Sequence, residues 1–234
     1  MKKYLLTNLS LLVFLCSYSQ TAVPPNTDKA AQFYFGIGAA YNNIKNLDAT
    51  LSNAGLPTIG KFNLAGIAEG DFRMKNLLLG VNSGMGAYEK KSDHYNTSMM
   101  NYSGGVNIGY YVVNSKKFHL APQAGIGFYS SQIKITQRNG FTNFNDVLVN
   151  GNSTDINQNT GVLDFCLKFD IADFTKDKSC LTGIRLGYKY GLSKRGWGID
   201  ETNNTTVTDS PKDRINQYYV LLTIGFTKLK PQKM

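Results

Sequence analysis

The chain is poor in the residues that usually build catalytic, metal and cross-linked sites. It contains two histidines, three cysteines and six prolines, against 23 glycines and 27 tyrosines and phenylalanines. No spacing of histidine or cysteine matches a zinc site, no phosphate-binding loop is present, and three cysteines exclude a disulfide-knotted scaffold. Low proline with high aromatic content argues against a disordered chain and favours β-structure. We therefore expect no metal and no cofactor.

Long apolar runs are absent as well. The first apolar segment, residues 4–16, follows two lysines, is interrupted by polar residues, and falls short of the about 20 residues that a membrane-spanning helix needs. Ser17 and Ser19 place small side chains where a signal peptidase reads the chain. The pattern predicts a cleaved signal peptide at residues 1–19. The exported product would begin at Gln20 with 23 basic and 16 acidic side chains, a net charge of +7.

Period-two alternation dominates the remaining sequence, after a polar linker at residues 20–30. Aromatic and branched side chains such as Phe33 share one face of each alternating segment, and small residues such as Gly36 share the other. Each apolar face carries essentially no charge. The alternation predicts eight strands, at about 31–41, 61–72, 77–88, 99–113, 117–135, 160–173, 180–192 and 215–228.

One segment, Ile44 to Ala54, has helical rather than strand periodicity. Ile44, Leu47 and Leu51 fall on one helical face, and Gly55 follows. We expect a short helix in the first long loop.

The links between the predicted strands alternate in length. The long links are 42–60, 89–98, 136–159 and 193–214, and the short ones are 73–76, 114–116 and 174–179. Outer-membrane barrels show this alternation because tight turns face the periplasm and long loops face the exterior, whereas soluble sandwiches and lipocalin-like barrels do not. The sequence predicts an all-β fold, an eight-stranded antiparallel up-and-down transmembrane β-barrel over residues 31–228, with a C-terminal tail at 229–234.

The charges within the strands indicate which face meets lipid. They fall on the glycine-rich face, and the expected register of the sixth and seventh strands places Asp164 opposite Lys189 and Lys168 opposite Arg185. An eight-stranded barrel has room inside for side chains and little else, so ionic groups belong inside and the apolar face outside. We predict a polar network in the lumen, formed by Glu69, Asp164, Lys168, Asp170, Arg185 and Lys189.

Two cysteines, Cys166 and Cys180, belong to the predicted exported chain. The same register places Cys166 opposite about Gly187, well away from Cys180. We predict that both are free and structural.

The pattern resembles the small eight-stranded outer-membrane β-barrel proteins of Gram-negative bacteria, in particular the outer-membrane-protein β-barrel domain common in Bacteroidetes. The resemblance covers nearly all of residues 31–228. More specific features are Ser17-Tyr18-Ser19 at the signal end, the loop Ala54-Gly55-Leu56-Pro57 and the strand opening Asn76-Leu77-Leu78-Leu79-Gly80. It implies localisation in the outer membrane, a monomer, and assembly by the barrel assembly machinery. Family members usually end on a terminal aromatic residue, whereas here eight residues follow Phe226.

The basic charge predicts contact with lipid rather than with nucleic acid. The lysines are spread through turns, loops and tail, without a stripe of interleaved aromatic residues. We expect the positive charge to meet anionic headgroups of outer-membrane lipid and lipopolysaccharide.

The sequence is compatible with three functions. His119 falls on a lumen position at the periplasmic end, where a structural role is expected. His94 follows Asp93 in the second outer loop, where a hydrolase or acyltransferase of this class would act. A narrow pore could use the charged lumen. We interpret the chain as a non-enzymatic structural or surface-interaction protein with a salt-bridged lumen and long loops that contact an unidentified extracellular ligand.

Overall fold

The computed structural model describes residues 29–92, 94–137, 153–173, 178–199 and 210–230. The predicted signal peptide, nearly all of the predicted linker and the last four residues of the predicted tail lie outside these ranges. The described chain is all-β apart from α2 (Lys45–Asn53), which lies within the segment that the sequence predicts to be helical. In these ranges, no helix has the length and hydrophobicity to cross a membrane.

Eight long strands build the fold, and four short strands lie in the connections between them. The long strands are β1 (Lys29–Asn42), β2 (Phe62–Met74), β3 (Leu77–Lys91), β4 (Tyr95–Tyr110), β6 (Phe118–Gln137), β7 (Ser153–Ile171), β8 (Lys178–Gly191) and β12 (Asn216–Lys230). The short strands are β5 (Val113–Asn114), β9 (Arg195–Gly196), β10 (Gly198–Ile199) and β11 (Lys212–Asp213).

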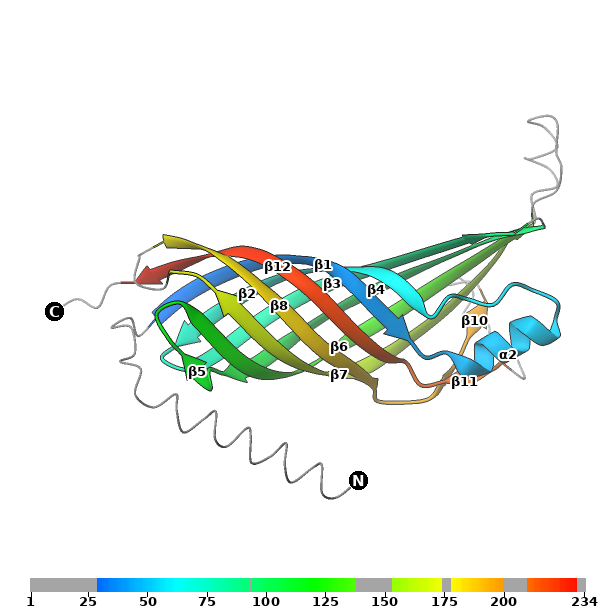
Figure 1. Ribbon diagram of the computed structural model, residues 1–234. Helices are drawn as coiled ribbons and strands as arrows, with labels where there is room; N and C mark the ends of the chain where they lie inside the picture. Colours follow the sequence, from blue (N-terminus) through cyan, green and yellow to red (C-terminus); the bar gives the residue numbers. More distant parts are fainter. Residues whose placement is uncertain (1–28, 93, 138–152, 174–177, 200–209, 231–234) are drawn as a thin grey trace, which may run out of the picture.

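The sheet closes on itself. Each long strand pairs antiparallel with the next long strand along the chain, and β1 pairs with β12 from Lys29↔Lys230 to Asn42↔Gln217. Closure removes the free edges that an open sheet would expose. Figure 1 shows the strands wound around one axis, with α2 at one end and with the start of β1 and the end of β12 at the other. The predicted eight-stranded up-and-down barrel is confirmed; we call these two ends the outer end and the terminal end.

The outward face of the barrel is apolar and the inward face is polar. On β12, Leu222 is 64% exposed whereas its neighbour Leu221 is 3% exposed. Leu167 and Leu186 also point outward, and they lie opposite each other on β7 and β8. A continuous apolar surface of this extent is unusual for a protein that meets only water.

Glycine on the inward face lets the strands approach closely. A methyl group at Gly38 would collide with the backbone carbonyl of Val220, across the pairing of β1 with β12. At the outward position Gly66, the nearest atom to such a group lies 3.6 Å away, which is ordinary contact. The inward glycines are therefore part of how the closed sheet packs.

The strict alternation of long and short links is wrong at two places. The predicted long link 89–98 is a three-residue turn, because β3 runs to Lys91 and β4 starts at Tyr95. The predicted short link 114–116 is longer, spanning 111–117, and contains β5. Backbone pairing needs no apolar alternation, so β3 and β4 continue into polar sequence where the periodic signal ends.

Candidate functional site

An ion-pair cluster around Lys168 occupies the lumen toward the terminal end. The fully buried ammonium of this β7 residue contacts a carboxylate of Asp71, and lies 3.6 Å from Glu69 Oε1 and 3.8 Å from Asp170 Oδ2. Glu69 and Asp71 belong to β2, so these pairs reach across the lumen rather than along neighbouring strands. A buried charge is tolerated in such a place only where opposite charges and hydrogen bonds surround it.

Arg185 and Tyr34 complete this cluster, which we call the lumen network together with the four charged residues above. The guanidinium of Arg185 pairs with Glu69. The ring of Tyr34 lies 3.6 Å from Lys168 Nζ and 4.8 Å from Arg185 Cζ, measured to the ring centroid. Its hydroxyl donates a hydrogen bond of 3.1 Å to Asp170. Tyr34 thus contacts two cations with the face of its ring and an acid with its hydroxyl group.

A second polar layer lies nearer the outer end. Tyr219 donates to Asp164 at 2.9 Å, and Lys189 donates to the hydroxyl of Ser103 at 2.7 Å. Gln217 donates to the side chains of two further inward residues at 2.9 Å each, Asn42 and Tyr129. A hollow of about 20 Å³ beside Lys189 has room for about one water molecule.

A third polar layer closes the lumen near the terminal end. Tyr111 leaves the wall after β4, turns inward, and donates to Gln32 on β1 at 2.9 Å. The guanidinium of Arg73 lies 4.9 Å from the centroid of the Tyr111 ring and donates to Asn114 at 3.1 Å. The buried ring of His119 packs on Tyr111, with 4.6 Å between ring centroids. The sequence predicts Arg73 in a turn, whereas it belongs to β2, one residue before the strand ends at Met74, and it is buried.

The outer end is covered by an apolar cluster, which we call the outer cap. Asp213 fixes α2 there, since its carboxylate accepts the backbone N–H groups of Asn46 at 3.0 Å and Leu47 at 2.9 Å. Its Oδ2 also accepts the indole N–H of Trp197 at 3.0 Å. A carboxylate at a helix N-terminus is favourable because the first amide groups have no partner within the helix. The cluster consists of Ile44, Leu47, Leu51, Ile59, Met99, Ile133, Ile135 and Trp197.

The structure places the six residues predicted for the lumen as follows. Glu69, Lys168, Asp170, Arg185 and Lys189 are buried, and Asp164 is partly buried. The register pairs Asp164 with Lys189 and Lys168 with Arg185, as the sequence predicts.

Although Asp164 and Lys189 lie opposite each other, each forms its hydrogen bond with another side chain. Asp164 accepts from Tyr219, and Lys189 donates to Ser103. The closest ion pairs instead cross to β2, where sequence reasoning missed Asp71. Its signal was present, since Asp71 lies two residues after Glu69 and so shares its face.

The two cysteines lie far apart in the register. Cys166 is opposite Gly187, as the sequence predicts, and Cys180 is opposite Phe226. Cys180 faces outward and is exposed, whereas Cys166 is partly buried.

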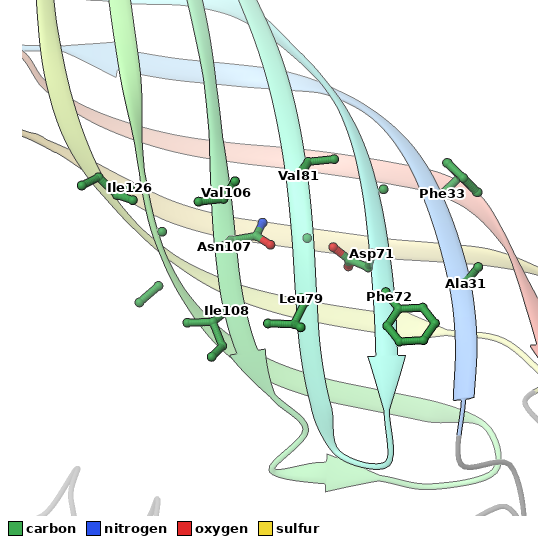
Figure 2. A pocket seen from close by; sticks show the side chains of 14 residues that line it. Ala31, Phe33, Asp71, Phe72, Leu79, Val81, Val106, Asn107, Ile108 and Ile126 are labelled. Atoms are coloured by element: carbon green, nitrogen blue, oxygen red, sulfur yellow. The ribbon is translucent and has the colours of Figure 1, made fainter.

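A hollow of about 870 Å³ lies on the outward wall of the barrel rather than in the lumen. Figure 2 shows its apolar lining. Phe33, Val81, Val106 and Ile126 lie along one row of register partners, with Gly70 of β2 between Phe33 and Val81. Small residues along its length leave the wall concave between larger side chains. Asp71 and Asn107 also line the hollow, but the Asp71 carboxylate pairs with Lys168 inside the barrel, so the outward wall offers contacts mainly for hydrocarbon.

The candidate catalytic histidine lies at the surface of the outer end. His94 is exposed in the turn between β3 and β4, and its predicted partner Asp93 lies outside the described residues. Among the described residues, no group of three or more His, Cys, Asp or Glu side chains could hold a metal ion.

Comparison with known proteins gives structural neighbours without sequence relatives. No protein-family model and no curated protein matches the chain. The solved structure of Ail, the attachment invasion locus protein of Yersinia pestis, is 9% identical with a TM-score of 0.47, covering 86% of this chain and 99% of that one. Neisserial surface protein A is 12% identical with a TM-score of 0.44, covering 86% and 97%. The outer membrane protease OmpT of Escherichia coli is 11% identical with a TM-score of 0.38, covering 91% and 100%.

These neighbours include both a protease and proteins without that description, and none of the three TM-scores reaches 0.5. The likeness therefore assigns no function to the chain. Because no family model matches, membership of the Bacteroidetes-type barrel family stays a prediction.

Proposed function

We propose that the chain is a non-enzymatic outer-membrane β-barrel protein, exported through a cleaved signal peptide, with a structural or surface-contact role. The observation that carries this proposal is the division of the barrel into an apolar outward face and a charged, filled lumen. In β1, outward apolar positions run from Ala31 to Tyr41, a stretch of eleven residues. A transmembrane strand needs about 9–11 residues.

An aromatic band near the outer end supports insertion in a bilayer. The rings of Tyr41 and Phe62 lie 5.2 Å apart between centroids, and those of Tyr188 and Tyr218 lie 4.6 Å apart. Tyr190 continues the band on β8, where Arg214 covers its ring at 4.8 Å. Tyrosine suits the membrane boundary because its ring is apolar and its hydroxyl reaches water.

The filled lumen supports a closed barrel over a pore. The lumen network and the third polar layer occupy the terminal half, and the outer cap covers the opposite end. An ion would have to separate buried pairs such as Arg185 with Glu69 to pass. Paired charges of this kind hold strands together in one arrangement, which suits a scaffold for loops.

Conductance in planar bilayers tests the closed barrel. The protein refolded from detergent is expected to give no single-channel conductance steps. The variants Asp164→Asn and Arg185→Gln are expected to give none either. Discrete steps in the wild-type protein whose size changes in either variant would establish a pore instead.

Turnover assays test the absence of catalysis. Purified protein is incubated with lipid A and with peptide substrates, beside His94→Ala. We expect no turnover in either. Hydrolysis or acyl transfer that disappears in His94→Ala would replace the proposed role by an enzymatic one.

In this proposal the protein is a monomer that the barrel assembly machinery inserts among outer-membrane lipid and lipopolysaccharide. The polar loops of the outer end then contact the extracellular ligand.

A further inference from the structure

Exposed lysines gather at the terminal end of the barrel. In the described chain, the only exposed acid at this end is Asp173. At the outer end, by contrast, the exposed Lys90 and Lys91 of β3 follow an exposed acid, and Lys91 pairs with Glu89 at 3.4 Å. The exposed lysines of the terminal end are Lys29, Lys75, Lys116, Lys117, Lys178 and Lys228.

Three of these lysines face outward where β1, β12 and β8 meet, and we call them the lysine seam: Lys29, Lys178 and Lys228. Lys178 lies directly opposite Lys228 in the register, and Lys29 lies opposite the backbone of residue 230. Like charges directly opposite each other on neighbouring strands are destabilising. None of the three forms an ion pair with a described residue. Among the described residues, no acid therefore neutralises their positive charge.

An apolar groove adjoins the lysine seam. It has a volume of about 510 Å³ and includes Lys178 in its lining. Its walls are Phe35 from β1 with Ile224 and Phe226 from β12, and these side chains are exposed on the outward face. Cys180 lies two residues beyond Lys178 on the same face, so the groove extends from the cation toward the middle of the strands.

We propose that the lysine seam and this groove together bind an anionic phospholipid. The phosphate would lie between the ammonium groups of Lys178 and Lys228, where it relieves their repulsion, and one acyl chain would occupy the groove. The proposal rests on the membrane insertion argued above. It adds a defined lipid site and a preference for negatively charged headgroups, which the general apolar surface does not provide.

Competition between labelled lipids in vesicles tests this site. The full chain is refolded into phosphatidylcholine vesicles, and the association of spin-labelled phosphatidylglycerol is compared with that of spin-labelled phosphatidylcholine. We expect a preference for phosphatidylglycerol that decreases with added salt. Lys178→Gln with Lys228→Gln should reduce it by roughly fivefold per lysine. Lys90→Gln with Lys91→Gln removes the same charge from the outer end and should leave the preference unchanged.

A second variant tests the groove independently of charge. Cys180→Phe fills the hollow without altering any lysine, and it should weaken association of both labelled lipids while the preference for phosphatidylglycerol persists. Equal association of the two lipids, or a preference that survives loss of Lys178 and Lys228, would overturn the proposal. Displacement of the lipid by millimolar inorganic phosphate would show an anion site that does not require a lipid, and would overturn it as well.

Insertion is measured in the same samples by heat-modifiable gel migration. If the protein inserts but shows no lipid preference, the proposed lipid site is contradicted and the proposed function is not. Protein that does not insert contradicts the proposed function, and the lipid site with it.

Discussion

At the scale of single residues, Lys168 is the most consequential side chain of the lumen. It faces Asp71, Glu69 and Asp170, and it is fully buried. Lys168→Met keeps an unbranched apolar stem but leaves the three carboxylates without this cation. We expect a loss of about 3–5 kcal/mol in the free energy of unfolding, measured by urea unfolding of the barrel in vesicles.

Lys90→Met is the matched control for that experiment. Lys90 is exposed on β3, and surface substitutions of this kind usually change stability by within about 0.5 kcal/mol. If both variants lost the same small amount, the ion pairs of the lumen network would not contribute as the structure indicates.

Glycine substitutions probe the close approach of β1 and β12. A methyl group in Gly38→Ala meets the backbone of Val220, which cannot move without disturbing the closing strand pair, so we expect a loss of about 1–3 kcal/mol. Gly66→Ala adds the same methyl group where there is room and should leave stability nearly unchanged. The folded fraction, read from heat-modifiable migration, compares the two. A folded fraction of Gly38→Ala equal to that of the wild-type protein would contradict the close approach of β1 and β12 at this position.

The residue scale also shows what the sequence predicts well. Asp164 opposite Lys189 follows from counting alternating positions, because the register of an antiparallel pair with a short turn is set locally. Tyr34 was not predicted as a member of the lumen network. Its contacts with Lys168 and Arg185 depend on how far the closed sheet curves, and no local pattern encodes that distance.

At the scale of elements, α2 and the outer cap respond to pH through Asp48. Burial raises the pKa of Asp48 above its usual 3.8, and the carboxylate of Asp213 raises it further, although the N–H of Ile59 that Asp48 accepts lowers it. The folded state thus binds this proton more tightly than the unfolded state does. The stability from this group is greatest at low pH and declines as pH rises through the folded pKa.

Trp197, the single tryptophan of the chain, reports this change. It is buried in the outer cap beside Asp213. We expect acrylamide quenching of its fluorescence to increase as the pH rises from about 3 to about 7. Asp48→Asn keeps an acceptor for Ile59 and removes the titration, so its quenching should stay nearly flat. An equal pH profile in the two proteins would assign the effect to another group.

Elements with a local periodic pattern could be predicted from the sequence, and elements without one could not. The helix was predicted because Leu47 and Leu51 repeat at helical spacing, and both are buried in α2. The anchor of that helix, Asp213, lies 165 residues after Asp48 in the sequence and gives no local signal. The outer part of β3 and β4 was missed for a similar reason, since polar pairs such as Lys90↔Thr97 carry no alternation.

For the whole molecule, the decisive property is whether lipid or water surrounds the outward face. Arginine substitutions at two different depths along the barrel wall test this. Leu222 lies midway along β12 on the outward face, and Leu192 lies just after β8, beyond the aromatic band. In a bilayer, Leu222→Arg should cost about 2–4 kcal/mol of folding free energy and Leu192→Arg about 0–1. The two variants carry the same chemical change, so only depth separates them. Refolding equilibria in vesicles give both values, and equal, small losses would mean that water surrounds the barrel, because an exposed arginine there has no desolvation cost.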